Sequence, residues 1–179
     1  MIFATVGTQL PFDRLLQAMD AWAEVHRDME VLAQTGQTTR HFPHLTATPF
    51  MDQKRFAECV GRAHVIVAHA GMGTILTAIE IGKPVVLMPR RADLGEHRND
   101  HQRDTAAEMS ALANVTVVED APELFAAIDA ALARSSDPCI ATRSSFASAQ
   151  LLEAVKEFIW SEPADTAPQN MWQARVSRR

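Results

Sequence analysis

The residues whose types and order could form a binding site lie in residues 65–90, VIVAHAGMGTILTAIEIGKPVVLMPR. The pattern predicts a buried strand over residues 65–68, then a turn of small residues, then a short helix from Thr74 to about Ile81. The turn reads His69-Ala70-Gly71-Met72-Gly73-Thr74. A turn of this kind exposes backbone N–H groups and the positive end of the helix dipole, which together bind anions. Residues 71–74 are therefore predicted to hold phosphate groups.

Two known phosphate-binding motifs do not fit this stretch. In the dinucleotide pattern GxGxxG the third glycine would fall at Leu76, and no acidic residue ends the next strand, over residues 85–88. Gly82-Lys83-Pro84 is not a P-loop, because no glycine lies five residues before it and Pro84 replaces the Ser or Thr. That tripeptide is predicted only to end the helix.

Histidines near this stretch could contact a ligand. His69 ends the buried strand and is either a hydrogen-bonded core histidine or a ligand contact; its place beside Gly71 favours the contact. His97 and His101 have a spacing that can clasp a metal, but no third ligand is evident and no metal is predicted. His101 and Gln102, at the start of a helix, suit hydrogen bonding to a polyhydroxylated ligand.

Composition excludes several classes of function. The 179 residues suffice for one domain with its own core. A formal charge of −5 and a pI near 5.8 argue against a nucleic-acid partner. Cys59 and Cys139 stand far apart, which indicates inert thiols in a reducing compartment. With no signal sequence and no run of about 20 apolar residues, the chain is predicted to be cytoplasmic, with any membrane contact made through a partner.

Short apolar runs separated by helical patterns predict an α/β fold with a doubly wound, mostly parallel six-stranded sheet. The expected strands cover residues 2–6, 30–34, 45–50, 64–68, 85–88 and 115–118. Ligands of such sheets bind beyond the carboxyl ends of the strands, where the strand order reverses. The turns at Gly7-Thr8-Gln9 and at residues 69–74 are therefore expected to flank one crevice.

The domain is expected to span residues 1–160 and to end in an amphipathic helix that includes Phe146. Residues 161–179 have a different character, with little apolar periodicity and a basic end. They are predicted to form a flexible tail. The alternative is a docking segment, in which Trp172 and the last arginines bind a partner or an anionic membrane surface.

Segments in one order along the chain resemble the C-terminal domain of family 28 glycosyltransferases. They are Thr5-Val6-Gly7-Thr8-Gln9 with Phe12-Asp13-Arg14-Leu15, Ala68-His69-Ala70-Gly71-Met72-Gly73-Thr74, Gly82-Lys83-Pro84, and Glu96-His97-Arg98-Asn99-Asp100-His101-Gln102. The likeness covers about residues 1–160. The opening segment is similar to that of the short, free-standing members, which are catalytic subunits of split glycosyltransferases. One branch of these makes bacterial exopolysaccharide and capsule, and a eukaryotic relative adds the second N-acetylglucosamine to a dolichol-linked precursor.

The resemblance implies the nucleotide-sugar-binding half of a GT-B fold. The amides of residues 71–74 would hold the diphosphate of a UDP-sugar, and the loop that contains Thr8 would close over the same phosphates or over the acceptor. His101 and Gln102 match positions that contact the hydroxyls of the donor sugar, with His69 beside the same ligand. No metal or other cofactor is implied, because the helix dipole and the amides stabilise the leaving nucleoside diphosphate.

Further positions have open roles. Thr77 stands where many relatives carry a glutamate that binds the ribose hydroxyls, so Thr77 is a weak candidate for that contact; Glu80 lies one turn further on and is not assigned the contact. Arg90 and Arg91 follow the strand over residues 85–88. One of them is expected to recognise a carboxylate, such as that of glucuronate; the alternatives are a contact with the diphosphate or a solvated loop.

The function expected from the resemblance is that of a glycosyltransferase subunit. With a membrane-anchored, acceptor-binding subunit that supplies the general base, it would transfer a hexose or uronic acid, with inversion, to a polyprenyl-diphosphate-linked saccharide in exopolysaccharide biosynthesis. The alternative is a non-catalytic module that binds a nucleotide sugar. A third option, an epimerase or hydrolase that acts alone, is disfavoured because no nucleophile motif, metal site or nicotinamide fingerprint is evident.

Overall fold

The structure is a computed structural model and describes residues 1–135. The helix expected around Phe146 and the tail expected over residues 161–179 lie outside the described residues, so the domain boundary near residue 160 stays a prediction.

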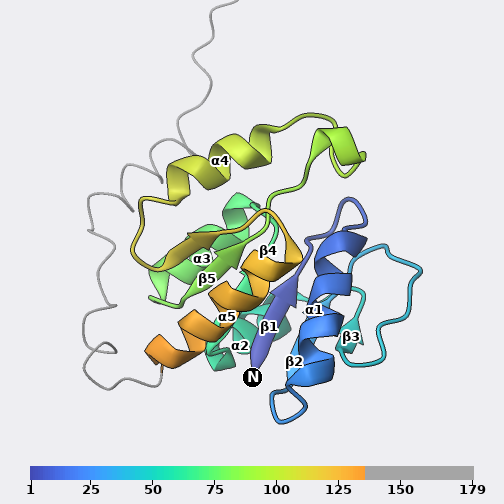
Figure 1. The fold of residues 1–179 in the computed structure, drawn as a ribbon, viewed down its shortest axis with the longest axis vertical. Coiled ribbons are helices and arrows are strands. Elements are labelled where there is room, and N and C mark those ends of the chain that lie inside the picture. The colour runs from blue at the N-terminus through green and yellow to red at the C-terminus, as the bar shows by residue number, and fades with distance from the viewer. Residues whose placement is uncertain (136–179) are drawn as a thin grey trace, which may run out of the picture. The chain divides into compact units, whose positions relative to one another are not determined.

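The described residues form one parallel sheet with helices on both faces (Figure 1). The strands are β1 (Ile2–Thr5), β2 (Val31–Gln34), β3 (Thr46–Thr48), β4 (Val65–Ala68), β5 (Val85–Leu87) and β6 (Val115–Val117). Their order is β3-β2-β1-β4-β5-β6, and every neighbouring pair is parallel. The predicted α/β fold with a six-stranded sheet is confirmed. Each strand is shorter than expected, by one to three residues.

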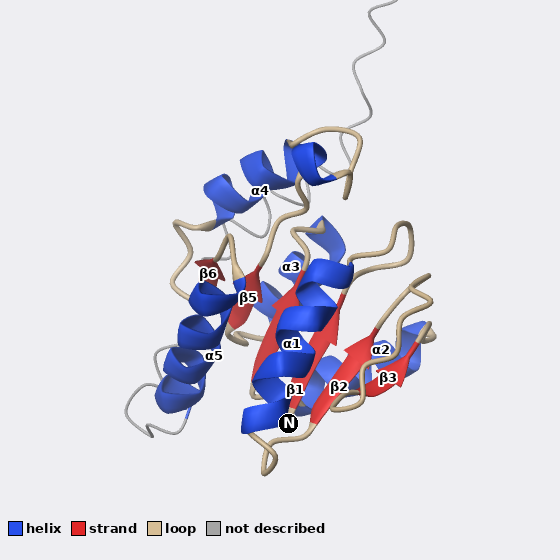
Figure 2. Ribbon diagram, turned by 45° about the vertical axis from the view of Figure 1, so that its right-hand side comes forward, coloured by secondary structure: helices blue, strands red, loops and turns tan. Residues whose placement is uncertain are grey.

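The helices are α1 (Asp13–Val25), α2 (Gln53–Arg62), α3 (Met72–Glu80), α4 (His101–Met109) and α5 (Ala121–Ser135), with a 3-10 turn, η1 (Ala92–Leu94). Helices α1 and α5 cover one face of the sheet and α2 and α3 cover the other (Figures 1 and 2). Turn η1 and helix α4 lie beyond the carboxyl ends of the strands. None of the helices within residues 1–135 has the length and apolar character needed to cross a membrane.

Side chains of the central strand β1 alternate between the two faces, as the pleat of a strand requires. Ile2 and Ala4 belong to the apolar core under α1 and α5, which also contains the fully buried Trp22. Phe3 points the other way and packs edge-on against Phe56 of α2, with 5.4 Å between the ring centroids. Thr5, two residues after Phe3, therefore faces the α2 and α3 side at the last position of the strand.

The strand order reverses between β1 and β4, which lie side by side at the centre of the sheet. The chain leaves β1 toward α1 on one face and leaves β4 toward α3 on the other. Diverging connections open a crevice above the strand ends, and this is where α/β sheets bind ligands. The arrangement matches the expectation from the sequence.

Candidate functional site

A pocket of about 620 Å³ occupies this crevice; we call it the strand-end pocket. Every residue that the sequence predicts for the site lines it. These residues are Thr8, His69, Gly71, Met72, Gly73, Thr74, Thr77, Arg90, His101 and Gln102. The fold thus brings together residues from the connections after β1, β4 and β5. The turns at residues 7–9 and 69–74 flank one crevice, as expected. The binding roles of the lining residues stay a prediction.

The first turn of α3 presents free backbone donors to the strand-end pocket. The helix begins at Met72, two residues before the expected start at Thr74, and Gly71 precedes it without a side-chain cap. The N–H groups of Met72, Gly73 and Thr74 donate no hydrogen bond within the described residues. The N–H of Gly71 is different, because it donates to the carbonyl oxygen of His69 at 2.7 Å. The predicted seat for phosphates therefore has three free amides, while the Gly71 amide already has an acceptor within the chain.

The imidazole of His69 lies between two glycines. A Cβ atom on Gly71 would clash with Nε2 of His69, and a Cβ atom on Gly7 would lie 2.7 Å from its Cε1 atom. Gly7 also has a φ of 74°, which L-residues rarely adopt. Both glycines are thus needed for the close approach of backbone to this ring.

His69 is held in its neutral form. Burial lowers the pKa of His69 to about 4, and the nearby charge of Arg90 lowers it further in the same direction. Its Nδ1 atom is buried and has no hydrogen-bond partner among the described residues. Nδ1 thus lacks the partner expected of a fully hydrogen-bonded core histidine, and a buried polar atom without a partner costs free energy.

Arg90 holds the loop between β1 and α1 instead of pointing at a ligand. Its side chain is almost fully buried, at 2% exposure. Nη1 donates to the carbonyl oxygens of Pro11 and Glu96, and Nη2 donates to those of Val6 and Leu10. The ring of Phe12 lies beneath the guanidinium, 4.7 Å from its Cζ atom. Burial lowers the pKa of Arg90 to about 10, at which the group remains charged at neutral pH.

These contacts correct the expectations for Arg90. A solvated loop is wrong because the side chain is buried. Recognition of a ligand carboxylate or diphosphate by the guanidinium fork is not supported, because both terminal nitrogens already donate to backbone carbonyls. Arg90 lines the pocket and positions the loop that contains Thr8.

A second arginine fixes the wall of the pocket that is formed by the connection from β5 to α4 and by the start of α4. Arg14 of α1 binds the carboxylate of Glu96 in a bidentate pair, with Nε–Oε1 at 2.8 Å and Nη2–Oε2 at 2.9 Å. The same guanidinium donates to the carbonyl oxygens of Pro89 and Glu119. Oε2 of Glu96 also accepts from the N–H of Arg91. The connection from β5 to α4 is therefore tied to α1 by charged hydrogen bonds.

His101 and Gln102 stand at the start of α4 on this wall. His101 is exposed at the pocket, and its ring lies 5.1 Å from that of His97. Gln102 is 6% exposed, and its Oε1 accepts from the N–H of Arg90 at 3.2 Å. That bond leaves the Nε2 donors of Gln102 without a partner in the described part of the chain. Both side chains can therefore donate to hydroxyls of a ligand, as the sequence predicts.

Thr77 lies one turn into α3 and lines the pocket. Its hydroxyl donates to the carbonyl oxygen of Gly73 at 2.9 Å. The proton of the hydroxyl is thus used within the helix, which leaves Thr77 only an acceptor role toward a ligand.

Several residues of the pocket lining have no role predicted from the sequence. Thr5 and Gln34, at the ends of β1 and β2, form its floor, and Met51 and Phe56 form an apolar part beside the start of α2. The AQTG segment that contains Gln34 predicts a strand end but gives no sign that the side chain reaches a pocket. Only the pairing of β2 with β1 brings Gln34 beside Thr5.

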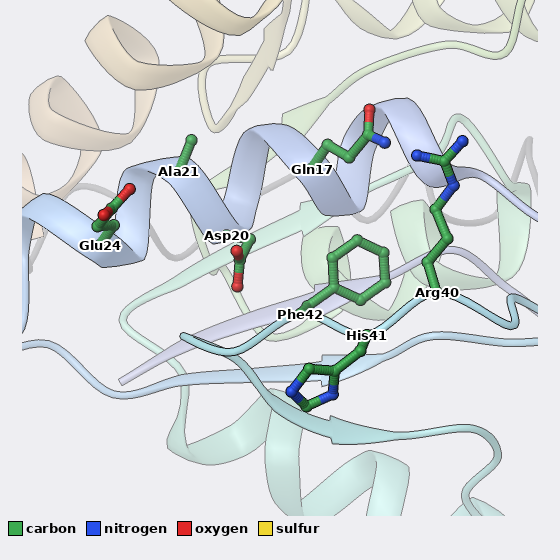
Figure 3. Close-up of a pocket in the computed structure, with 7 residues that line it drawn as sticks. All are labelled: Gln17, Asp20, Ala21, Glu24, Arg40, His41 and Phe42. Carbon is green, nitrogen blue, oxygen red and sulfur yellow. The ribbon is translucent and has the colours of Figure 1, made fainter.

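Among residues 1–135, no three His, Cys, Asp or Glu side chains gather in a way that could hold a metal ion. A second hollow, the α1 groove, has a volume of about 460 Å³ and lies between α1 and the segment after β2 (Figure 3). Its lining is Gln17, Asp20, Ala21, Glu24, Arg40, His41 and Phe42. In Figure 3, Gln17 and Arg40 stand at one end of the α1 groove and Glu24 at the other.

Comparison with known proteins places the chain among glycosyltransferase domains. The sequence matches the glycosyltransferase family 28 C-terminal domain over residues 1–158 and therefore belongs to that family. It is 26% identical over 126 residues to the UDP-N-acetylglucosamine transferase subunit ALG13 of Yarrowia lipolytica. That match covers 61% of this chain and 60% of the relative.

The fold matches solved structures over most of the chain. A crystal structure of the glycotransferase of kitacinnamycin superposes with a TM-score of 0.61 at 21% identity, covering 86% of this chain and 39% of that one. An NMR structure of ALG13 gives a TM-score of 0.53 at 16% identity, covering 76% of this chain and 87% of that one. The structural neighbours include GT-B glycosyltransferases, which confirms the predicted fold class. The chain spans 60% of its curated relative and less than half of the kitacinnamycin enzyme.

Proposed function

We propose that the chain is the donor-binding catalytic subunit of an inverting, UDP-sugar-dependent glycosyltransferase. The observation that carries the proposal is the set of free amides at Met72, Gly73 and Thr74, opposite the free donors of Gln102 and His101 in one pocket. Amides at a helix N-terminus stabilise a diphosphate, and imidazole and amide side chains can hydrogen-bond to sugar hydroxyls. Membership of the family supports the same ligand.

In this proposal the acceptor hydroxyl attacks the anomeric carbon of the donor sugar from the face opposite the leaving group. The bond between that carbon and the diphosphate oxygen breaks, and the nucleoside diphosphate leaves with the bonding electrons. The amides of α3 and the dipole of the helix stabilise the negative charge that develops on the leaving oxygen. No metal is needed for this stabilisation.

A partner subunit supplies the base that takes the proton from the acceptor. Within the described residues, the lining of the strand-end pocket contains no carboxylate, and its most buried imidazole, that of His69, is too weak a base at a pKa of about 4. We infer that the partner is membrane-anchored and binds a polyprenyl-diphosphate-linked saccharide. The chain would act at the cytoplasmic face of the membrane, transferring a hexose or uronic acid in exopolysaccharide biosynthesis.

Titration calorimetry of the purified chain with UDP tests the ligand. Gly73 lines the pocket, and a Cβ atom there meets no atom within 4 Å, so Gly73→Val is expected to fold and to obstruct the diphosphate seat. Gly61 of α2 is the matched control, since it is also a helical glycine with open space around it but lies outside the pocket. UDP affinity should fall at least tenfold in Gly73→Val and stay unchanged in Gly61→Val. Equal UDP affinity in the two variants would contradict the proposed seat.

The absence of a carboxylate from the described lining also favours a second candidate, a module that binds a nucleotide sugar without catalysis. Co-expression with a membrane-anchored partner separates the two. Sugar transfer that appears only with the partner supports the split enzyme, whereas UDP binding without transfer in any combination supports the module. A comparison of UDP-glucuronate with UDP-glucose tests the sugar; because Arg90 is occupied, we expect similar affinities.

A further inference from the structure

Gln34 is a buried polar side chain at the floor of the strand-end pocket. The residue ends β2, is 4% exposed, and lines the pocket. Leu32, two residues earlier, occupies the same face of the sheet and is buried in apolar surroundings. An apolar side chain would fill the position of Gln34 at lower cost, because a buried amide needs hydrogen-bond partners.

A short chain of hydrogen bonds fixes the orientation of the Gln34 amide. The N–H of Gly7 donates to Oγ1 of Thr5 at 3.3 Å, so the hydroxyl proton of Thr5 is free to donate elsewhere. It donates to Oε1 of Gln34 at 2.6 Å. Oε1 therefore faces Thr5, and the NH2 group of the amide faces away from it.

The NH2 group of Gln34 has no partner in the part of the chain that the structure describes. Within residues 1–135, Nδ1 of His69 is the one side-chain nitrogen or oxygen that is both fully buried and without a partner. Nε2 of Gln34 lacks a partner but does not belong to this class, so the atom is not fully buried. Nε2 therefore keeps access to the pocket. Two N–H donors on a side chain that is 96% buried point to an acceptor group on a ligand.

The strand order places Gln34 between two different parts of the pocket. The free amides of α3 follow β4, and the apolar residues Met51 and Phe56 follow β3. In the sheet, β2 lies between β3 and the β1–β4 pair. A nucleoside diphosphate with its phosphates on α3 and its flat base against Met51 and Phe56 would place the ribose above Gln34.

We propose that Gln34 donates a hydrogen bond from Nε2 to a ribose hydroxyl of the bound nucleoside diphosphate. The inference rests on the proposed function and adds the residue that recognises the ribose. Thr77 does not offer this donor, because its hydroxyl proton goes to Gly73. Thr5 is the positioning residue that keeps the amide of Gln34 in the productive orientation.

The test compares three ligands, UDP, 2′,3′-dideoxy-UDP and inorganic pyrophosphate, by titration calorimetry. Wild-type protein should bind UDP about three- to tenfold more tightly than the dideoxy analogue, the range expected for one neutral hydrogen bond. Gln34→Met should lose this preference and retain the wild-type affinity for pyrophosphate. Thr35→Val is the matched control, since Thr35 is the next buried residue and lies outside the pocket lining.

An NMR measurement on the wild-type protein makes the test independent of how well Gln34→Met folds. The side-chain NH2 resonances of Gln34 should shift on addition of UDP and move much less with 2′,3′-dideoxy-UDP. Unchanged resonances with saturating UDP, or a UDP preference that survives in Gln34→Met, would overturn the ribose contact. If UDP affinity falls in Gly73→Val while Gln34→Met still prefers UDP to the dideoxy analogue, only this inference fails. If wild-type protein binds neither UDP nor pyrophosphate, the proposed function fails with it.

Discussion

The two hollows of this domain differ in whether their polar groups already have partners. In the α1 groove the charged side chains pair with one another or with nearby backbone: Arg40 binds Asp13 at 2.9 Å, and Asp20 accepts from the N–H of His44. In the strand-end pocket the reverse holds. Amides of α3, the NH2 groups of Gln34 and Gln102, and Nδ1 of His69 have no partner among the described residues.

The difference favours the strand-end pocket as the ligand site that we propose. Gln34 and Gln102 are buried, and buried donors without a partner are costly, so a fold retains them where something else satisfies them. The charged side chains of the α1 groove, Arg40, Glu24 and Asp20, have such partners already. Substitutions in the two hollows should therefore have different consequences, and the following predictions test that difference.

The largest expected effect is on stability, in Glu96→Gln. Glu96 and Arg14 are 12% and 24% exposed, and the change leaves the Arg14 guanidinium without its charged partner behind the pocket wall. We expect the free energy of unfolding to fall by about 3 kcal/mol, the lower end of the range for breaking a buried pair, because Arg14 keeps some solvent. Urea denaturation measures this loss. A loss below about 1 kcal/mol would mean that the wall does not depend on the pair.

The second effect is a dependence of stability on pH that comes from His69. Its pKa is about 4 in the folded state and near 6.5 in the unfolded chain. Between these pH values the unfolded state binds a proton that the folded state does not. The free energy of unfolding is therefore highest above pH 6.5 and falls as the pH drops toward 4. The loss should approach about 3 kcal/mol near pH 4.

Unfolding curves at several pH values, recorded for wild type and His69→Gln, measure this contribution. The variant should show a flatter dependence between pH 6.5 and 4.5. Parallel curves for the two proteins would show that the imidazole of His69 titrates normally in the fold.

The third effect is on ligand affinity, in Gly71→Ala. The added methyl group displaces the ring of His69 toward the pocket, because Gly7 blocks it on the other side. UDP affinity should fall about tenfold, which corresponds to about 1.4 kcal/mol. Titration of this variant with UDP provides the measurement. Retained affinity would show that the position of His69 does not matter for binding.

The smallest effect is expected in the α1 groove, for Arg40→Gln. The pair with Asp13 is largely exposed, so the free energy of unfolding should change by less than about 0.5 kcal/mol. Affinity for UDP should be unchanged. A marked loss of UDP binding in Arg40→Gln would show that the α1 groove also takes part in ligand binding.

The fold could be predicted because its signals are local. Each strand is a short apolar run, and the glycines and prolines between them mark turns. Helix α3 begins two residues before the predicted start, because the low helix propensity of Gly71 and Gly73 favours a turn on local grounds. Tertiary context overrode the local preference there.

The site could be predicted as a set of residues but not as a set of contacts. Gly73 and Gln102 lie in the pocket as expected, since the rule for parallel sheets brings strand ends together. The role of Arg90 was not foreseen, because its partners are backbone carbonyls that any sequence provides. The donors of Gln34 went unnoticed for a similar reason: they depend on the register between β1 and β2.

The arginine that holds the loop after β1 has a consequence for the order of folding. Val6, Leu10 and Pro11 are tied by a side chain about 80 positions later in the chain, at the end of β5. Contacts so distant in sequence form late, because a long segment must first be closed into a loop. The sheet can therefore pair β1 with β2 and β4 before this loop takes its final shape. Binding of ligand would then report that the loop after β1 has reached its final shape.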